Sequence, residues 1–161
     1  SRCVAGMCKK LAISVSGEAA VDETWMKQVE LGGLLHDIGK LMIPWSLLNR
    51  IRPLTLRDIK QLHKHVASGE EILRSVGVPV LAEIIAEHHE RMDGKGYPRG
   101  KKKISLAGSI VAVSDAYEAM TSESRKYRSP MLPSEAMREV MSGAGTQFDP
   151  EVARALSAVV D

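Results

Sequence analysis

Apolar residues recur along this chain at steps of three and four, which is the spacing of one face of an α-helix. In the segment that follows Thr55, these positions are Ile59, Leu62, Val66, Gly69, Leu73 and Val76. No stretch alternates apolar and polar residues convincingly, as a half-buried β-strand would. The sequence therefore predicts an all-α fold, a compact bundle of about seven helices.

Capping and helix-breaking residues predict where the helices begin and end. Polar N-cap residues precede four of the apolar segments, at Asp22, Thr55, Ser105 and Asp149. Gly39 is expected to end the helix that starts near Asp22, and residues 44–55 are expected to be a connector because they contain two prolines. Gly32 and Gly33 indicate that another backbone approaches this second helix closely.

The composition is ordinary for a soluble globular protein, with 44% apolar and 26% charged residues. One domain is expected, residues 1–161. The net charge of +2 is too small to indicate a nucleic-acid polymer or a membrane as partner, and no apolar run approaches the roughly 20 residues that span a bilayer. Two cysteines, taken as free thiols, favour a cytoplasmic protein. Because the chain begins at Ser1 without methionine, we expect a fragment that lacks an upstream regulatory domain.

The candidate functional residues are histidines that lie beside carboxylates. Four of the five histidines lie at the ends or flanks of apolar segments, which is ligand chemistry for a divalent metal. Neighbouring side chains on a helix diverge by about 100°, but at a helix end His88 and His89 can point into one pocket. Gly94 and Gly96 permit positive φ just beyond them. His63 is expected to point to solvent.

The adjacent pair His36-Asp37 predicts a site for two ions, because one carboxylate can bridge two metals while the histidine binds one of them. His36 and Asp115 are expected to complete the first ion's shell. Two ions about 3.5–4 Å apart clamp a phosphoryl group and lower the pKa of a shared water until it is a hydroxide near neutral pH. No serine or cysteine nucleophile has a recognisable setting, so a hydroxide that bridges the metals is the expected attacker. The second ion's ligands are expected to be His65, His88 and His89.

Asp37 and Lys40 are the expected catalytic residues, since Lys40 would reach a phosphate oxygen. Each candidate also has an ordinary explanation when taken singly. Lys40 could neutralise a helix C-terminus, Asp115 could be an exposed helix carboxylate, and Tyr97 could be a hydrophobic plug under its turn. Together they fit one site, because unpaired ionisable groups on so many apolar borders would be costly.

Five motifs, in this order and spacing, resemble the HD-GYP domains of bacterial cyclic-di-GMP phosphodiesterases, members of the HD superfamily. The motifs are LLHDIGK (34–40), HVASG (65–69), HHERMDGKGYP (88–98), VSDAYEAMTS (113–122) and QFDP (147–150). The resemblance covers essentially the whole chain. It implies an all-helical HD-type fold, two or three iron or manganese ions, and hydrolysis of cyclic di-GMP to linear pGpG or on to GMP.

The resemblance also implies how substrate and partners are bound. Lys40, Arg125 and Arg128 are expected near the phosphates of the dinucleotide. The loop Gly96-Tyr97-Pro98 is expected to line the substrate and to contact a diguanylate cyclase or an adaptor. An upstream sensory or receiver domain is expected as well.

The chain departs from the family pattern in several places. It starts where a further metal-binding histidine is expected, and a glutamate used for a third metal in some members also falls outside it. Ser109 and Ser105 stand where arginine and proline are usual, and the loop after Thr121 is one residue longer, with Lys126 replacing a proline. The missing ligands bear on metal occupancy, and the other departures bear on substrate binding.

Two alternatives to a cyclic-di-GMP phosphodiesterase follow from the same motifs. The first is a non-catalytic receptor or scaffold that binds the nucleotide, or a diguanylate cyclase, through the Gly-Tyr-Pro surface. The intact set of metal-ligand candidates argues against it, since a scaffold has no use for them. The second is an HD phosphohydrolase for another nucleotide, which the Gly-Tyr-Pro loop disfavours while leaving related cyclic dinucleotides open as substrates.

Overall fold

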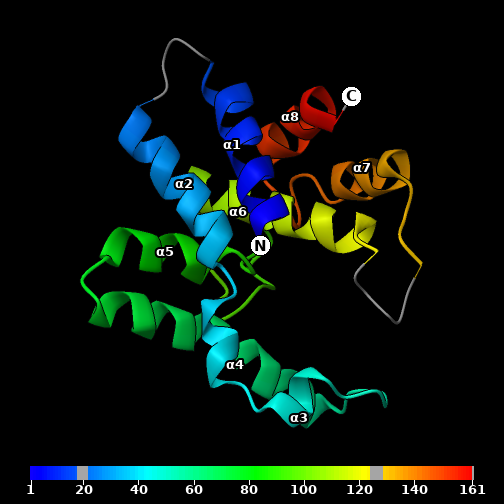
Figure 1. Cartoon of the computed structure of the whole chain (residues 1–161). Helices are drawn as coiled ribbons and strands as arrows, with labels where there is room; N and C mark the ends of the chain where they lie inside the picture. The colour runs from blue at the N-terminus through cyan, green and yellow to red at the C-terminus, as the bar shows by residue number, and fades with distance from the viewer. Residues whose placement is uncertain (18–21, 124–128, 161) are drawn as a thin grey trace.

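Eight α-helices and one 3-10 helix make up the described part of the chain, residues 1–17, 22–123 and 129–160 of a computed structural model (Figure 1). These residues contain no β-strand, so the all-α prediction is confirmed. None of the described helices is long and apolar enough to cross a membrane. In order, the helices are α1 (Arg2–Ser16), α2 (Glu23–Leu35), η2 (Ile38–Met42), α3 (Trp45–Leu48), α4 (Leu56–Ser75), α5 (Pro79–Glu87), α6 (Leu106–Thr121), α7 (Pro133–Ser142) and α8 (Pro150–Val160).

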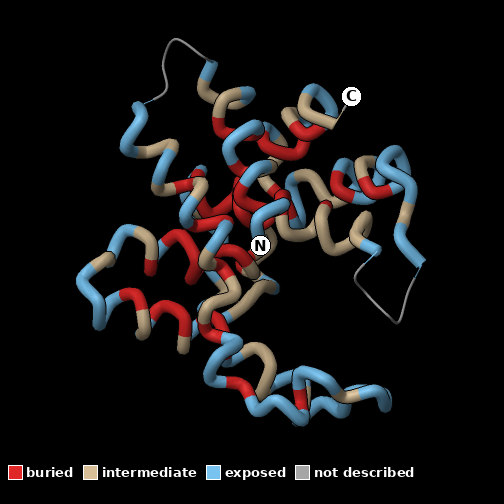
Figure 2. The backbone as a smooth tube through the Cα atoms, viewed as in Figure 1, coloured by how far each residue is buried: buried red, intermediate tan, exposed pale blue. Residues whose placement is uncertain are grey.

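The larger hydrophobic core lies where α1, α2 and α6 meet α7 and α8 (Figure 2). Its members come from the apolar stripes of these helices, as helical periodicity requires. The fully buried ones include Leu11, Val29, Ile110, Val140 and Leu156. A second, smaller cluster of Leu73, Ala82 and Ile85 joins α4 to α5.

The predicted N-caps are confirmed by hydrogen bonds. Oδ1 of Asp22 accepts from Thr24 N at 3.0 Å, and Oγ of Ser105 accepts from Gly108 N at 3.0 Å. Thr55 and Asp58 form the predicted capping box at the start of α4. These caps satisfy backbone N–H groups that have no partner within the helix.

Gly39 does not end α2, contrary to the sequence prediction. The helix ends at Leu35, and Gly39 lies within η2. A Cβ at Gly39 would lie 1.9 Å from the carbonyl oxygen of His65, so this glycine allows the backbones of η2 and α4 to touch. The expected close approach of a backbone is confirmed at Gly33, where a Cβ would lie 3.2 Å from Cα of Ala5 in α1, but at Gly32 the nearest atoms to a Cβ are side-chain atoms of Ile84 and Val111.

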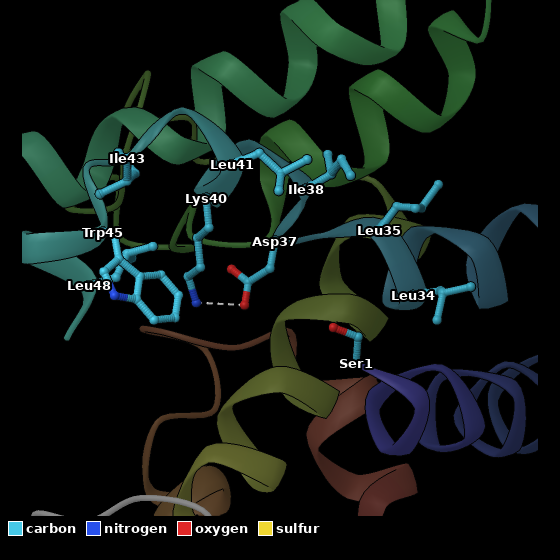
Figure 3. Close-up of a pocket in the computed structure, with 10 residues that line it drawn as sticks. All are labelled: Ser1, Leu34, Leu35, Asp37, Ile38, Lys40, Leu41, Ile43, Trp45 and Leu48. Atoms are coloured by element: carbon cyan, nitrogen blue, oxygen red, sulfur yellow. Dashed lines mark hydrogen bonds and ion pairs between the residues drawn. The ribbon is translucent and has the colours of Figure 1, made fainter.

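The connector contains one helix that the apolar pattern does not reveal. The single turn α3 follows Pro44, whose φ of −55° suits the start of a helix. At four residues it is too short to show periodicity, which is why the structure has one α-helix more than the predicted seven. Its Trp45 is exposed and lies next to Lys40 of η2 (Figure 3).

Candidate metal centre

All six predicted metal ligands gather at one place in the structure. They come from the end of α2 (His36), the residue before η2 (Asp37), the middle of α4 (His65), the residues after α5 (His88 and His89), and α6 (Asp115). The ring centroid of His88 lies 5.3 Å from that of His36, 5.5 Å from that of His65 and 4.0 Å from that of His89. Four stretches that are far apart in sequence therefore meet, as the motif order predicts.

Three of the histidines are oriented by their own helices. Nδ1 of His36 lies 2.8 Å from the carbonyl oxygen of Gly33, and Nδ1 of His65 lies 2.7 Å from that of Leu62. Nδ1 of His88 makes the same contact three residues back, with Ile85. A carbonyl can only accept, so each Nδ1 carries the proton, and the neutral rings of His65 and His88 present a lone pair at Nε2.

The site fits a metal ion by the chemistry of these lone pairs. Nε2 of His65 and Nε2 of His88 are buried, and neither has a hydrogen-bond partner among the described residues. A buried polar atom without a partner is costly unless something else satisfies it. One nitrogen from each of His65, His88 and His89 lies within 4.8 Å of the others, so the three could hold one ion.

Burial keeps these three histidines neutral. It lowers the pKa of His65, and it lowers the pKa of His88 well below the ordinary value, with a further contribution from neighbouring His89. For His89, burial lowers the pKa to about 4 despite the charges of Asp115 and Asp37. Neutral imidazole is the form that binds a metal, so these rings are available as ligands near neutral pH.

His36 behaves differently because two carboxylates face it. Its Nε2 lies 3.4 Å from Oδ1 of Asp115 and 3.3 Å from Oδ2 of Asp37. Burial alone would lower the pKa of His36, but hydrogen bonds with Asp115 and Asp37 outweigh it and raise the pKa to about 10. Burial likewise opposes ionisation of Asp37, yet His36 and Lys40 hold the pKa of that carboxyl below its ordinary value. The negative charges of Asp37 and Asp115, which a bound metal ion would neutralise, are thus present.

Lys40 lies beside Asp37 and in the last turn of η2. Its Nζ donates a hydrogen bond to Oδ2 of Asp37 at 2.6 Å, and its side chain is 47% exposed. Figure 3 shows this pair with the indole of Trp45 next to it. The Lys40 ammonium group therefore lies between the candidate ligands and solvent.

The loop after His89 is held by three buried glutamates that the sequence reasoning did not single out. Glu90 accepts backbone N–H bonds from Arg99 at 2.7 Å and Lys101 at 2.9 Å. Glu87 accepts from the backbone of Ser105 at 2.9 Å, and Glu70 accepts from the guanidinium of Arg99. In the sequence, the only sign of this role is that Glu87 and Glu90 flank the pair His88-His89.

Only Tyr97 of the Gly-Tyr-Pro loop has its side chain against the metal-ligand candidates. Its ring stacks on His89, with centroids 4.7 Å apart. Gly96 packs against backbone instead, since a Cβ there would lie 2.5 Å from Arg91 N, and Pro98 is exposed. The predicted phosphate contacts Arg125 and Arg128 lie outside the described residues.

His63 does not point to solvent, contrary to the sequence prediction. It is half-buried, and its ring stacks on the free side of Tyr97 with centroids 3.7 Å apart and planes 6° from parallel. His63 precedes His65 by two residues on α4, so their side chains leave the helix in different directions. Flat contact with an aromatic ring, which periodicity cannot reveal, accounts for its position.

Two cavities open beside the candidate ligands. One, of about 550 Å³, is lined by Asp37, Lys40 and Trp45 among others (Figure 3). The second, of about 720 Å³, is lined by Lys40, His65, His89 and Tyr97 and by the connector from α3 to α4. Both volumes lie in the range of small-molecule sites, roughly 300–1,000 Å³.

A helical bundle that gathers neutral histidines and ionised aspartates between its helices defines a candidate metal-binding hydrolase domain. The chain belongs to the HD domain family, whose sequence pattern matches residues 4–152. The HD-type fold and the family resemblance expected from the motifs are therefore confirmed.

Curated relatives and a solved structure agree with this assignment. The chain is 39% identical over 146 residues to a cyclic di-GMP phosphodiesterase of Thermotoga maritima, and 36% identical over 140 residues to 3'3'-cGAMP-specific phosphodiesterase 1 of Vibrio cholerae. The matches cover 88% and 85% of the chain but 39% and 31% of these relatives, so the chain spans well under half the length of either. The structure of an HDG"Y"P protein from Bdellovibrio bacteriovorus superposes with a TM-score of 0.73, over 99% of this chain and 52% of that one, at 19% identity.

Proposed function

We propose that this domain is a metal-dependent phosphodiesterase that hydrolyses cyclic di-GMP to linear pGpG, or further to GMP. The observation that carries the proposal is the position of the Asp37 carboxylate. Its Oδ2 lies 3.3 Å from Nε2 of His36, and its Oδ1 lies 3.5 Å from Nε2 of His65. A carboxylate that faces a different histidine with each oxygen is arranged to bridge two ions. The names of the relatives in Thermotoga and Vibrio support a cyclic dinucleotide as substrate.

The proposed cofactors are two or three divalent ions, iron or manganese, which suit a mixed set of imidazoles and carboxylates. When bound, such ions stabilise the charge on the phosphoryl oxygens and lower the pKa of the attacking water. Asp37 is the proposed shared ligand. The remaining ligands are His36 and Asp115 for one ion, and His65, His88 and His89 for the other.

The chain's own residues position the substrate. Lys40 is the proposed phosphate contact, because its exposed ammonium already lies 2.6 Å from a carboxylate oxygen at the centre and can exchange that partner for a phosphate oxygen. Tyr97 forms a wall that limits access of water to His89. Arg125 and Arg128 remain predicted phosphate contacts. The exposed Pro98 is the proposed contact point for a diguanylate cyclase or an adaptor.

The proposal is tested by incubating the domain, loaded anaerobically with Fe²⁺ or with Mn²⁺, with cyclic di-GMP and separating the products by chromatography. We expect pGpG to form, and chelation or the substitution Asp37→Asn to abolish turnover. Asp22→Asn is the matched control, since Asp22 is an exposed N-cap remote from the centre and asparagine caps equally well.

Two results would contradict the proposal. Turnover that survives thorough chelation would exclude the metal mechanism. Binding of cyclic di-GMP without hydrolysis, in protein shown to contain metal, would favour the non-catalytic receptor.

A further inference from the structure

Two cavities flank Lys40 and share only that residue and Leu48 among their walls. Asp37 lines the first cavity, and His65 and His89 line the second. The candidate metal centre thus lies between the cavities. A phosphate held at Lys40 would have a small-molecule-sized space on each side, which is the arrangement that a dinucleotide with two bases requires.

The first cavity offers an uncovered aromatic ring. Trp45 is 78% exposed, although a tryptophan side chain gains considerably from burial. Its indole lies next to the Lys40–Asp37 pair in Figure 3. A nucleobase stacks on such a ring whatever its identity, because every base has a π-face. This cavity can therefore hold a purine without distinguishing guanine from adenine.

The second cavity offers a hydrogen-bond donor in addition to apolar walls. Leu62 and the stacked pair His63 and Tyr97 form one side of it, and the connector contributes Arg50 and Arg52. Arg50 is engaged in an ion pair with Asp58. Arg52 is exposed, and no ion pair or hydrogen bond joins its side chain to the described residues.

Arg52 is chemically matched to guanine. The N7 and O6 atoms of guanine accept two hydrogen bonds from one guanidinium, whereas adenine places a donor amino group at the same edge. The two relatives described above are named for substrates that differ in one purine, guanine in one and adenine in the other. A single base-reading cavity is sufficient to make that distinction.

We propose that a cyclic dinucleotide straddles Lys40, with one purine stacked on Trp45 in the first cavity and the other in the second, where Arg52 selects guanine. This inference rests on the proposed function for the phosphate position. It adds one base-stacking residue, Trp45, and one specificity residue, Arg52, and none of the five motifs contains either. Neither residue has a place in the metal centre, so both can be replaced without removing a ligand.

The test compares cyclic di-GMP, 3'3'-cGAMP and cyclic di-AMP as substrates of the manganese-loaded protein. Trp45→Ala is expected to raise KM for all three about tenfold to a hundredfold, with kcat and metal content unchanged, and Trp45→Phe to restore most of the loss. Arg52→Met is expected to raise KM for cyclic di-GMP by a similar factor, about tenfold or more, while leaving cyclic di-AMP nearly unaffected. The controls are Met42→Ala, an exposed apolar residue of η2 that lines neither cavity, and Arg57→Met, an exposed arginine of α4.

Several results would overturn the inference. An unchanged KM in Trp45→Ala, or an equal effect of Met42→Ala, would remove Trp45 from the site. An equal loss for cyclic di-GMP and cyclic di-AMP in Arg52→Met would make Arg52 a contact for phosphate rather than for guanine. If none of the three is hydrolysed, the proposed function fails. The same three cyclic dinucleotides are then titrated calorimetrically into the same variants. Their affinities test the base-binding inference independently of hydrolysis.

Discussion

Nε2 of His65 lies 3.5 Å from Oδ1 of Asp37, although the two residues belong to different elements, α4 and the turn before η2. The contact exists because the backbones of η2 and α4 touch at Gly39 and Gly69. A Cβ at Gly39 would lie 1.9 Å from the carbonyl oxygen of His65 and 2.5 Å from the nitrogen of Gly69. The spacing between the two groups of candidate ligands is therefore set by a glycine.

Gly39→Ala is expected to separate η2 from α4 and to disrupt the candidate metal centre. The atoms in the way are backbone atoms and cannot move aside alone, so the cost should be at or above the upper end of overpacking penalties, about 3 kcal/mol. Urea unfolding and metal analysis after dialysis would measure the two effects. Gly6→Ala is the control, because a Cβ at Gly6 meets nothing within 4 Å and alanine favours a helix. Full metal content and unchanged stability in Gly39→Ala would refute this account of the contact.

The stability of the metal-free protein should depend on pH through its histidines. Burial lowers the pKa of His65, His88 and His89 in the folded state, while in the unfolded chain these groups titrate near 6.5. Below about pH 6.5, and down to about pH 4 for His89, the unfolded chain therefore binds more protons. Stability falls as the pH falls, by up to about 1.4 kcal/mol per pH unit for each histidine that is still neutral in the folded state. Denaturant unfolding of chelator-treated protein across this range would measure the slope.

His36 should produce the opposite dependence above neutrality. Burial opposes its charge, but Asp115 and Asp37 raise its folded pKa to about 10. Its contribution is fully present below pH 6.5 and is lost as the pH rises toward 10, so metal-free stability should be greatest near pH 6.5. A flat profile from pH 4.5 to pH 8.5 would mean that these histidines titrate normally.

The helices and the convergence of the candidate ligands were predictable from the sequence because each leaves a local signal. Periodic apolar residues mark the stripes that form the core, and Asp22, Thr55 and Ser105 cap helices through short-range hydrogen bonds. The candidate ligands stand within recognisable motifs, at helix ends for His36, His88 and His89 and inside helices for His65 and Asp115, so their convergence followed once the motifs were read together. What these residues do in catalysis remains a prediction.

The features that escaped prediction depend on contacts between distant segments. A glycine after a helix usually marks its end, and only the folded chain reveals that Gly39 touches α4. His63 looked solvent-facing on its helix, yet Tyr97, from a loop 34 residues away, covers its ring. Glu90 is nearly fully buried because the loop folds back over it, which no property of its neighbours indicates.

Glu90→Gln is expected to destabilise the domain by about 1.5–3 kcal/mol, because one of the two oxygens that accept backbone N–H bonds from Arg99 and Lys101 becomes a donor. The loop that carries Tyr97 should loosen, and turnover should fall along with stability. Glu83→Gln, on the exposed face of α5 with a side chain 70% exposed, is the matched control and should change stability by less than about 0.5 kcal/mol. Unfolding curves of both variants would measure these changes in stability. Equal stability of the two would show that Glu90 does not hold the loop.

His65→Ala is expected to release metal, whereas His63→Ala should retain it. The two histidines are two residues apart on α4, but Nε2 of His65 points at Asp37 and the ring of His63 lies flat on Tyr97. Loss of an outer partner of a ligand typically weakens metal binding 10–100-fold, so loss of a direct ligand should weaken it by about a hundredfold or more. The helices should persist in His65→Ala, because His65 lies beside the apolar stripe of α4 that runs through Leu62, Val66 and Leu73 rather than in it. Metal stoichiometry after dialysis against a weak chelator, with circular dichroism on the same samples, separates ligand loss from unfolding. Equal occupancy in the two variants would mean that His65 is not a ligand and that the assignment of histidines to the second ion is wrong.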